Sequence, residues 1–124
     1  MEKDEILSMF FAMHYVDMSE LNDIHYDNSV MLKRAQNFIH SFNELAKNLN
    51  EDSTSEEITF HSYEHAKTFY GKDNLRDWFS DMNLILFDKK DGARLPNFIM
   101  IYGVNNFIER VDHRINYYFS LFKL

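Results

Sequence analysis

The sequence predicts an α+β domain, with a helical N-terminal part packed on a small, mainly antiparallel sheet and a C-terminal helix. Apolar residues between positions 29 and 49 recur at helical spacing, whereas positions 83–88 and 96–104 hold unbroken apolar runs, which are typical of strands buried on both faces. The length of 124 residues is common for one domain. We therefore expect a single domain over residues 1–124.

Two helices are predicted in the first half of the chain. Between positions 4 and 16, Ile6, Phe10 and Met13 follow helical spacing, and the polar stretch 19–28 reads as a connector. Asn28 and Ser29 can each cap a helix, and the apolar period that follows them predicts a second helix of about 20 residues, which would span about 30 Å.

Shorter elements are predicted in the middle of the chain. Residues 50–57 contain no apolar side chain and read as a solvated loop, and residues 58–61 alternate briefly, which favours a short strand. A brief helix over 63–70 would be closed by Gly71 in a left-handed conformation. Asp73 would cap another helix that buries Trp78, with Asp77 and Asp81 as solvated charges at its flanks.

The predicted sheet centres on a hairpin. Its strands are the apolar runs, and Asp91 with Gly92 supplies the turn. A sheet that is apolar on both faces needs two covers. If the helices supplied only one cover, a second copy of the chain would supply the other, so we expect a homodimer in that case.

The last segment is predicted as a helix. Asn106 and Glu109 have the spacing of a capping box, and the apolar residues that follow gather on one helical face. Because alternate positions are also apolar, a strand over residues 117–124 is the alternative.

Composition excludes several classes of protein. The absence of cysteine excludes disulfides and thiolate chemistry, and the scattered glycines Gly71, Gly92 and Gly103 form no phosphate-binding loop, so we expect no cofactor. The acidic start lacks the pattern of a signal peptide, and no apolar run has the length of a membrane span. We expect a cytoplasmic protein with no membrane contact.

Charge suggests the function. Residues 1–57 contain 12 acids and 4 bases, a net charge of 4 − 12 = −8, while residues 58–124 contain 8 acids and 9 bases, a net charge of +1. Negative charge repels phosphate backbones and steers cationic proteins, so we expect no direct nucleic-acid binding. The sequence predicts a contact-acting inhibitor, immunity-type protein or phage-type antagonist that masks a basic protein surface with Asp17, Glu20, Asp23, Glu51, Asp52, Glu56 and Glu57.

A small-molecule-binding or catalytic domain is the alternative. Its pocket would be lined by an aromatic and histidine set: His61, His65, Trp78 and Tyr102. The two histidines lack the order of a zinc-protease motif, so we expect no metal site, and no nucleophile accompanies them, which favours contact over catalysis. A third hypothesis has the predicted hairpin tip, with Lys89, Lys90 and Arg94, touch nucleic acid or an acidic protein.

Overall fold

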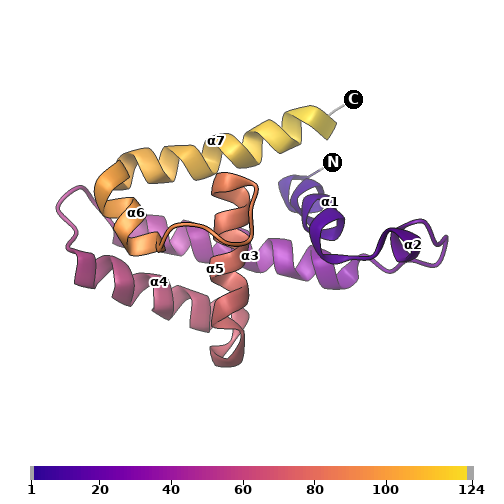
Figure 1. Cartoon of the computed structure of the whole chain (residues 1–124), viewed down its shortest axis with the longest axis horizontal. Coiled ribbons are helices and arrows are strands. Elements are labelled where there is room, and N and C mark those ends of the chain that lie inside the picture. Colours follow the sequence, from indigo (N-terminus) through magenta and orange to yellow (C-terminus); the bar gives the residue numbers. More distant parts are fainter. Residues whose placement is uncertain (1, 123–124) are drawn as a thin grey trace.

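A computed structural model describes residues 2–122 and contains helices but no strand in that range. The helices are α1 (Lys3–Tyr15), α2 (Met18–Leu21), α3 (Ser29–Asn48), α4 (Ser55–Tyr70), the short 3₁₀ helix η1 (Lys72–Asn74), α5 (Leu75–Phe87), α6 (Leu95–Tyr102) and α7 (Val104–Phe122). The expected α+β class is therefore wrong, and the fold is a bundle of helices (Figure 1).

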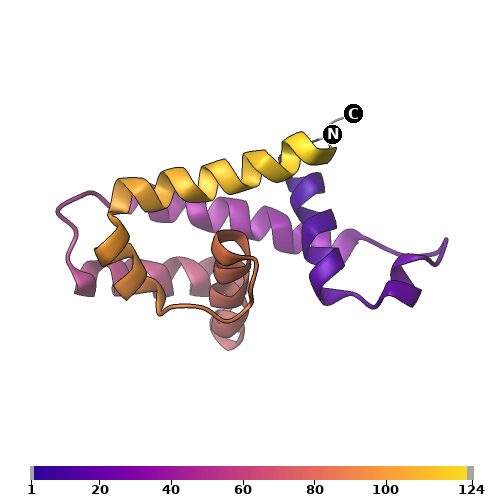
Figure 2. The same cartoon turned by 45° about the horizontal axis from the view of Figure 1, so that its top comes forward.

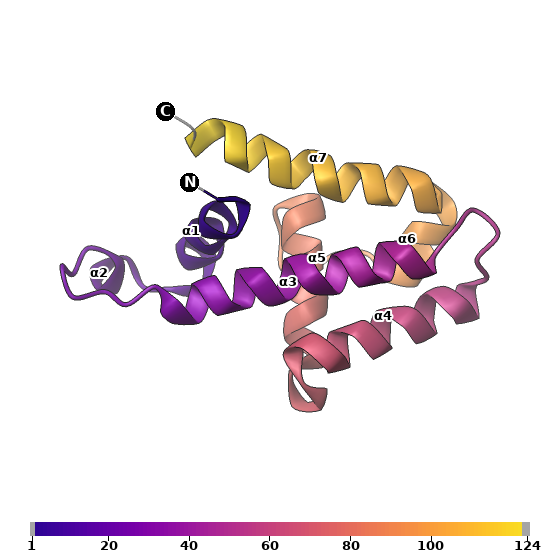
Figure 3. The ribbon, with the colours of Figure 1, turned by 180° about the vertical axis from the view of Figure 1, so that it is seen from behind.

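The bundle is organised around α5. This helix crosses between α7 on one side and α4 on the other (Figure 1), while the long α3 runs past it, as the view from behind shows (Figure 3). Helix α1 packs on α3 and α7 at one end of the bundle, and α2 projects beyond that end (Figure 2). The two ends of α3 thus carry different structures: the α2 segment at its start and the turn into α4 at its finish.

The predicted hairpin is wrong because α5 is surrounded. Leu84, Ile85 and Leu86 lie on successive sides of one helix, and each is at most 1% exposed. A helix that other helices cover on every side has apolar residues on every side. Its sequence is then an unbroken apolar run, like that of a strand in the middle of a sheet. Asp88 ends α5 with a φ of 59°, and residues 88–94, including the expected Asp91–Gly92 turn, form the loop to α6.

The second predicted strand is helix α6, whose first turn contains Pro96. Proline is favoured there because the first turn of a helix needs no internal N–H donor. Ile99 is fully buried, but Ile101 is 90% exposed, so this apolar run belongs to a helix with one face in solvent. The homodimer argument depended on a bare sheet face, and without a sheet it has no basis.

The strand expected at 58–61 is also wrong. Thr54 and Glu57 form a reciprocal capping box that starts α4 inside the segment predicted as loop. The buried residues Ile58, Ser62 and Ala66 recur every four positions, which is the one-sided burial of an amphipathic helix. Gly71 ends α4 at a positive φ of 92°, as expected, but its ψ of 150° places it outside the left-handed helical region.

The remaining helices follow the predictions closely. Helices α1 and α3 agree with the expected segments, and α7 continues to Phe122, so the strand alternative is wrong for residues 117–122; residues 123 and 124 lie outside the described residues. Asn28 occupies the N-cap position of α3, as predicted, although its side chain makes no capping hydrogen bond, and the other two predicted caps are wrong. Asp73 lies within η1, and α7 begins two residues before Asn106.

One hydrophobic core joins the helices. Its largest fully buried side chains include Trp78 from α5, Phe11 from α1, Phe38 from α3 and Phe107 from α7. The indole N–H of Trp78 donates to the Ser41 hydroxyl at 2.8 Å, which in turn donates to the Phe38 carbonyl at 2.8 Å. None of the described helices is long and apolar enough to cross a membrane.

Candidate functional site

The seven acidic residues predicted to bind a partner lie at opposite ends of α3. Asp17, Glu20 and Asp23 belong to the α2 segment before its start. The other four lie in the turn into α4 or in its first helical turn: Glu51, Asp52, Glu56 and Glu57. The 20 residues of α3 separate the two groups by about 30 Å, so they do not form one surface.

At the α4 end, two of the carboxylates serve the fold. Glu51 accepts a hydrogen bond from the Asn105 backbone N–H at 3.0 Å, which caps the exposed start of α7. Glu57 accepts from the Thr54 backbone N–H at 3.0 Å, and these local hydrogen bonds lower the pKa of Glu57. Two of the four acidic residues in this group are therefore helix caps.

The opposite end, which we call the α1–α2 end, is acidic in its own sequence, although Arg34 and Lys90 from other segments lie 4.0 Å and 4.5 Å from the centroid of the Tyr15 ring of α1. Residues 4–32 contain no lysine or arginine and six acids: Asp4, Glu5, Asp17, Glu20, Asp23 and Asp27. The last four of these are exposed, and none of them forms an ion pair with another described residue. Burial raises the pKa of Tyr26, and the charges of Glu20 and Asp27 raise it further.

An apolar groove lies within this acidic end. It has a volume of about 530 Å³ and is lined from α1 by Met9, Ala12 and Met13 and from the α2 segment by Leu21 and Tyr26. Met13 of this lining is 62% exposed, and elsewhere in the α2 segment Met18 is 65% and Ile24 91% exposed. Methionine side chains adapt to many apolar shapes, which is why they are frequent at protein-binding surfaces.

The four residues of the predicted pocket do not meet. Trp78 is fully buried in the core, and Tyr102 lies on α6, stacked on Phe98 with ring centroids 4.9 Å apart. His61 and His65 are neighbours on one face of α4, with ring centroids 6.1 Å apart. Burial, and after it the nearby His61, lowers the pKa of His65. No three histidine or acidic residues within 2–122 lie close enough together to hold a metal.

The sequence reasoning missed a buried ionic cluster centred on Asp81. This residue was expected in solvent but is 0% exposed. Arg34 donates from Nε to Oδ2 at 2.7 Å and from Nη2 to Oδ1 at 2.9 Å, and the Tyr70 hydroxyl donates to Oδ2 at 2.8 Å. The Tyr15 hydroxyl donates to Oδ1. One carboxylate therefore joins α1, α3, α4 and α5.

The cluster is built for stability rather than for acid–base catalysis. Each oxygen of Asp81 already accepts two hydrogen bonds, so neither is free for a substrate. The guanidinium of Arg34 also lies 4.0 Å from the centroid of the Tyr15 ring, where a cation is attracted to the aromatic face. We conclude that the Asp81 cluster is a clamp between helices.

Two arginines of α7 bind the last turn of α5. Arg110 donates to the Leu86 carbonyl at 2.7 Å and Arg114 to the Ile85 carbonyl at 2.8 Å, so two unpaired carbonyls of the last turn gain charged donors. Hydrogen bonds from Tyr118 and Arg114 hold the pKa of Asp88 below its usual range. These side chains are likewise committed to the fold.

Alkaline titration tests both clusters. Burial, together with the adjacent carboxylate, raises the pKa of Tyr15, Tyr70 and Tyr118 well above the ordinary value of about 10. A folded pKa above the unfolded one adds stability below pH 10, and that stability is lost as the pH rises beyond it. We expect three of the seven tyrosines to ionise only as the chain unfolds, measured by ultraviolet absorbance beside circular dichroism. Seven tyrosines titrating together before unfolding would contradict the clusters.

Comparison with known proteins gives partial similarities. No protein-family model matches the chain, and no solved structure matches it. The lysine–tRNA ligase of Rickettsia bellii (strain OSU 85-389) is 38% identical over 45 residues, which are 36% of this chain and 9% of the ligase. The lysine–tRNA ligase of Rickettsia prowazekii (strain Madrid E) is 26% identical over 105 residues, 85% of this chain and 19% of the ligase. The chain thus spans less than a fifth of the length of these relatives.

Proposed function

We propose that the chain is a protein-binding module that acts by contact, and that its α1–α2 end docks on a basic, partly apolar helix of a partner protein. The observation that carries this proposal is the methionine-lined groove within a stretch of six acids that has no lysine or arginine. We expect the encounter in the cytoplasm, as the cysteine-free sequence predicts.

The chemistry of this end favours such a partner on two counts. The groove offers apolar surface to the apolar face of an amphipathic helix, a common mode of peptide recognition. The exposed carboxylates of Asp17, Glu20 and Asp23 would face the basic side of that helix and raise the rate of association. Both features suit an inhibitor or immunity-type protein that masks a basic surface.

The test uses an amphipathic leucine–lysine peptide as the probe and measures binding by fluorescence anisotropy. We expect micromolar affinity at about 50 mM salt, weakened about tenfold at about 500 mM, because screening reduces the attraction of exposed charges. The charge-reversal pair Glu20→Lys and Asp23→Lys should weaken binding at least tenfold. Both sites are exposed in the α2 segment, and Asp23→Lys removes only a local hydrogen bond from the His25 backbone N–H, so folding of the bundle should be unchanged.

The matched control reverses two charges at the far end of α3, with Asp52→Lys and Glu56→Lys. These residues are also exposed, and their variant has the same net charge. We expect it to bind the peptide like the unaltered protein. If both variants lost the same amount of peptide affinity, the attraction would be non-specific. A second peptide, with glutamine at every leucine position, keeps the charge but should bind poorly if the groove contributes. Equal losses of affinity in the two variants, or tight binding of the glutamine peptide, would overturn the proposed docking site.

A second candidate function follows from the similarity to lysine–tRNA ligases, whose name states that they act on tRNA. In this alternative the chain contacts tRNA through the loop between α5 and α6, where Lys89, Lys90 and Arg94 are exposed. Adding labelled tRNA to the same assay separates the two candidates. The docking proposal expects no tRNA binding at about 150 mM salt, because the negative N-terminal half repels phosphate. Binding that is lost when all three cations become serine would favour the alternative.

A further inference from the structure

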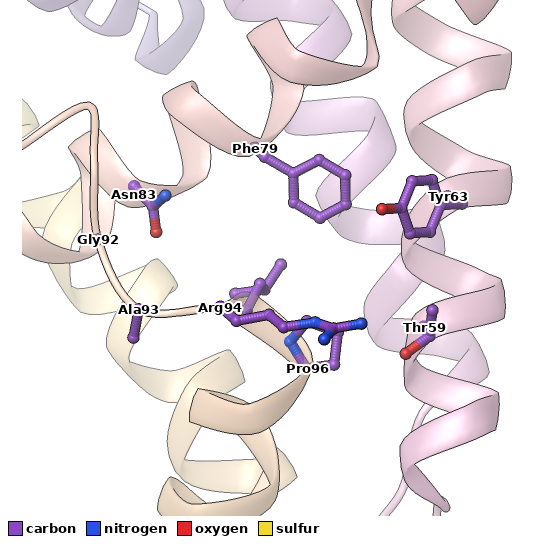
Figure 4. Close-up of a pocket in the computed structure, with 9 residues that line it drawn as sticks. Thr59, Tyr63, Phe79, Asn83, Gly92, Ala93, Arg94 and Pro96 are labelled. Atoms are coloured by element: carbon purple, nitrogen blue, oxygen red, sulfur yellow. The ribbon is translucent and has the colours of Figure 1, made fainter.

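A cavity of about 260 Å³ lies between α4, α5 and the start of α6 (Figure 4). Thr59 and Tyr63 of α4 form one wall, Phe79 and Asn83 of α5 form another, and the loop residues from Gly92 to Arg94 pass beneath them with Pro96 beside them. This cavity is separate from the Asp81 cluster and from the α1–α2 end, which other residues line.

Three hydrogen-bond donors at this cavity have no partner among residues 2–122. The Arg94 guanidinium extends across the cavity toward Thr59, and the amide nitrogen of Asn83 is turned toward Phe79 (Figure 4). The Tyr63 hydroxyl points into the space beside Phe79 (Figure 4). Neither these two groups nor the Arg94 guanidinium forms a hydrogen bond or ion pair with another residue in the described part of the chain.

The carbonyl oxygen of Asn83 is buried and also lacks a hydrogen-bond partner among residues 2–122. It lies against Gly92, where an added Cβ would come within 3.0 Å of it. Glycine at this position lets the loop pass close to α5, which leaves the amide nitrogen of Asn83 as the part of this side chain directed to the cavity. As an acceptor, this buried oxygen needs a donor such as water and would not attract an anion, so only the amide nitrogen of Asn83 can serve an anionic ligand.

The charge at the cavity is opposite to that of the whole chain. Arg94 is the one charged residue among the residues that line it, whereas the chain has a net charge of −7. The rings of Tyr63 and Phe79 meet with centroids 5.1 Å apart and present an aromatic wall. Donors without a carboxylate beside them select an anion, and an aromatic wall selects an apolar body.

We propose that this cavity binds a small organic carboxylate with an aromatic or branched apolar body. The carboxylate pairs with the Arg94 guanidinium and accepts from Tyr63 or Asn83, while the body packs on Phe79 and Pro96. The volume of about 260 Å³ lies just below the usual range for drug-sized ligands, so the ligand has about ten non-hydrogen atoms. This site does not depend on the docking proposal.

The test uses benzoate as the probe and benzamide as its uncharged counterpart. Titration of each into the ¹⁵N-labelled protein is followed by NMR, with the backbone amides of Thr59, Ala93 and Arg94 as reporters. We expect saturable shifts with benzoate and a Kd of about 1 mM, because a ligand of this size has little surface to bury. Benzamide should bind at least tenfold more weakly.

Arg94→Gln provides the decisive variant. Arg94 is exposed and makes no side-chain contact that caps α6, so the variant should fold normally. We expect it to bind benzoate about tenfold more weakly and benzamide unchanged, a split that a mere change in loop structure would not produce. Arg76→Gln, which removes an exposed charge from α5 away from the cavity, should leave both affinities unchanged.

Three results would overturn the site. They are benzoate shifts that do not saturate by about 20 mM, equal affinity for benzamide, and benzoate binding that survives Arg94→Gln. The docking variant with lysine at positions 20 and 23 serves as a cross-check, because it should retain benzoate binding. Failure of the peptide assay would therefore count against the docking proposal, and failure of the benzoate assay would count against the cavity.

Discussion

Arg34→Met lowers the free energy of unfolding by about 3–5 kcal/mol, because it removes the only charged partner of a buried carboxylate in the described structure. Asp81 would keep its two tyrosine donors but lose both guanidinium hydrogen bonds. Methionine retains the apolar length of the arginine side chain, so the loss reports mainly on charge. Urea unfolding followed by circular dichroism measures it.

A double variant separates the clamp from simple packing. Arg34→Met with Asp81→Leu removes both charges, and replacing a buried ion pair by apolar residues is often close to neutral. We therefore expect the double variant to be more stable than Arg34→Met alone. Arg76→Met, at an exposed position, should change stability by less than about 0.5 kcal/mol. Strictly additive losses in the double variant would contradict a coupled ionic cluster.

Trp78→Ala should cost about 3–5 kcal/mol, because the largest side chain of the core would leave a cavity at the centre of the bundle. The indole is 0% exposed and packs edge-on against Phe79, with ring centroids 4.9 Å apart. Urea unfolding again gives the value. A loss below about 1 kcal/mol would mean that α5 does not hold the central position described above.

Ser41→Ala is the matched variant for this site. It keeps Trp78 but leaves the indole N–H without its acceptor, and a buried donor without a partner costs about 1–3 kcal/mol. We expect the loss of the Ser41 hydroxyl to lower the free energy of unfolding by less than Trp78→Ala does. A blue shift of tryptophan fluorescence would accompany it, because the indole loses a polar neighbour.

The sequence allowed good prediction of elements whose signals are local. The period of α3 is unambiguous over 20 residues, and Gly71 ends α4 at a positive φ as expected. The spacing of Thr54 and Glu57 is that of a capping box, which predicts the start of a helix. This signal is stronger evidence than the brief alternation after Ile58. A capping box is a stronger signal than a four-residue alternation because it satisfies specific backbone groups.

The sheet could not be excluded from pattern alone. The run from Leu84 to Phe87 has the same composition in a central helix as in a central strand, and only the packing of other helices around it decides the outcome. One local clue was available. Asp81 follows Trp78 by three residues and precedes Ile85 by four, so on a helix it falls among buried positions and needs a partner.

The identity of that partner was beyond local reasoning. Arg34 lies 47 positions away from Asp81 and Tyr15 lies 66 positions away, and no period in the sequence links them. The arrangement of the two acidic groups at the ends of α3 was also beyond local reasoning. Their summed charge is visible in the sequence, but their separation by the length of α3 is not, and that separation reduces the predicted seven-residue surface to the α1–α2 end. The cavity at Arg94 also depends on contacts between segments distant in sequence.

The central place of α5 affects how the chain acquires its structure on the ribosome. Helices α1 and α3 emerge first and can pair, but Phe11 and Phe38 then lack Trp78, Met82 and Ile85, which arrive with α5. Nascent chains with uncovered aromatic surface are prone to aggregate. Synthesis must therefore pass residue 87 before the first half of the chain is shielded, and chaperones have most to protect during that interval.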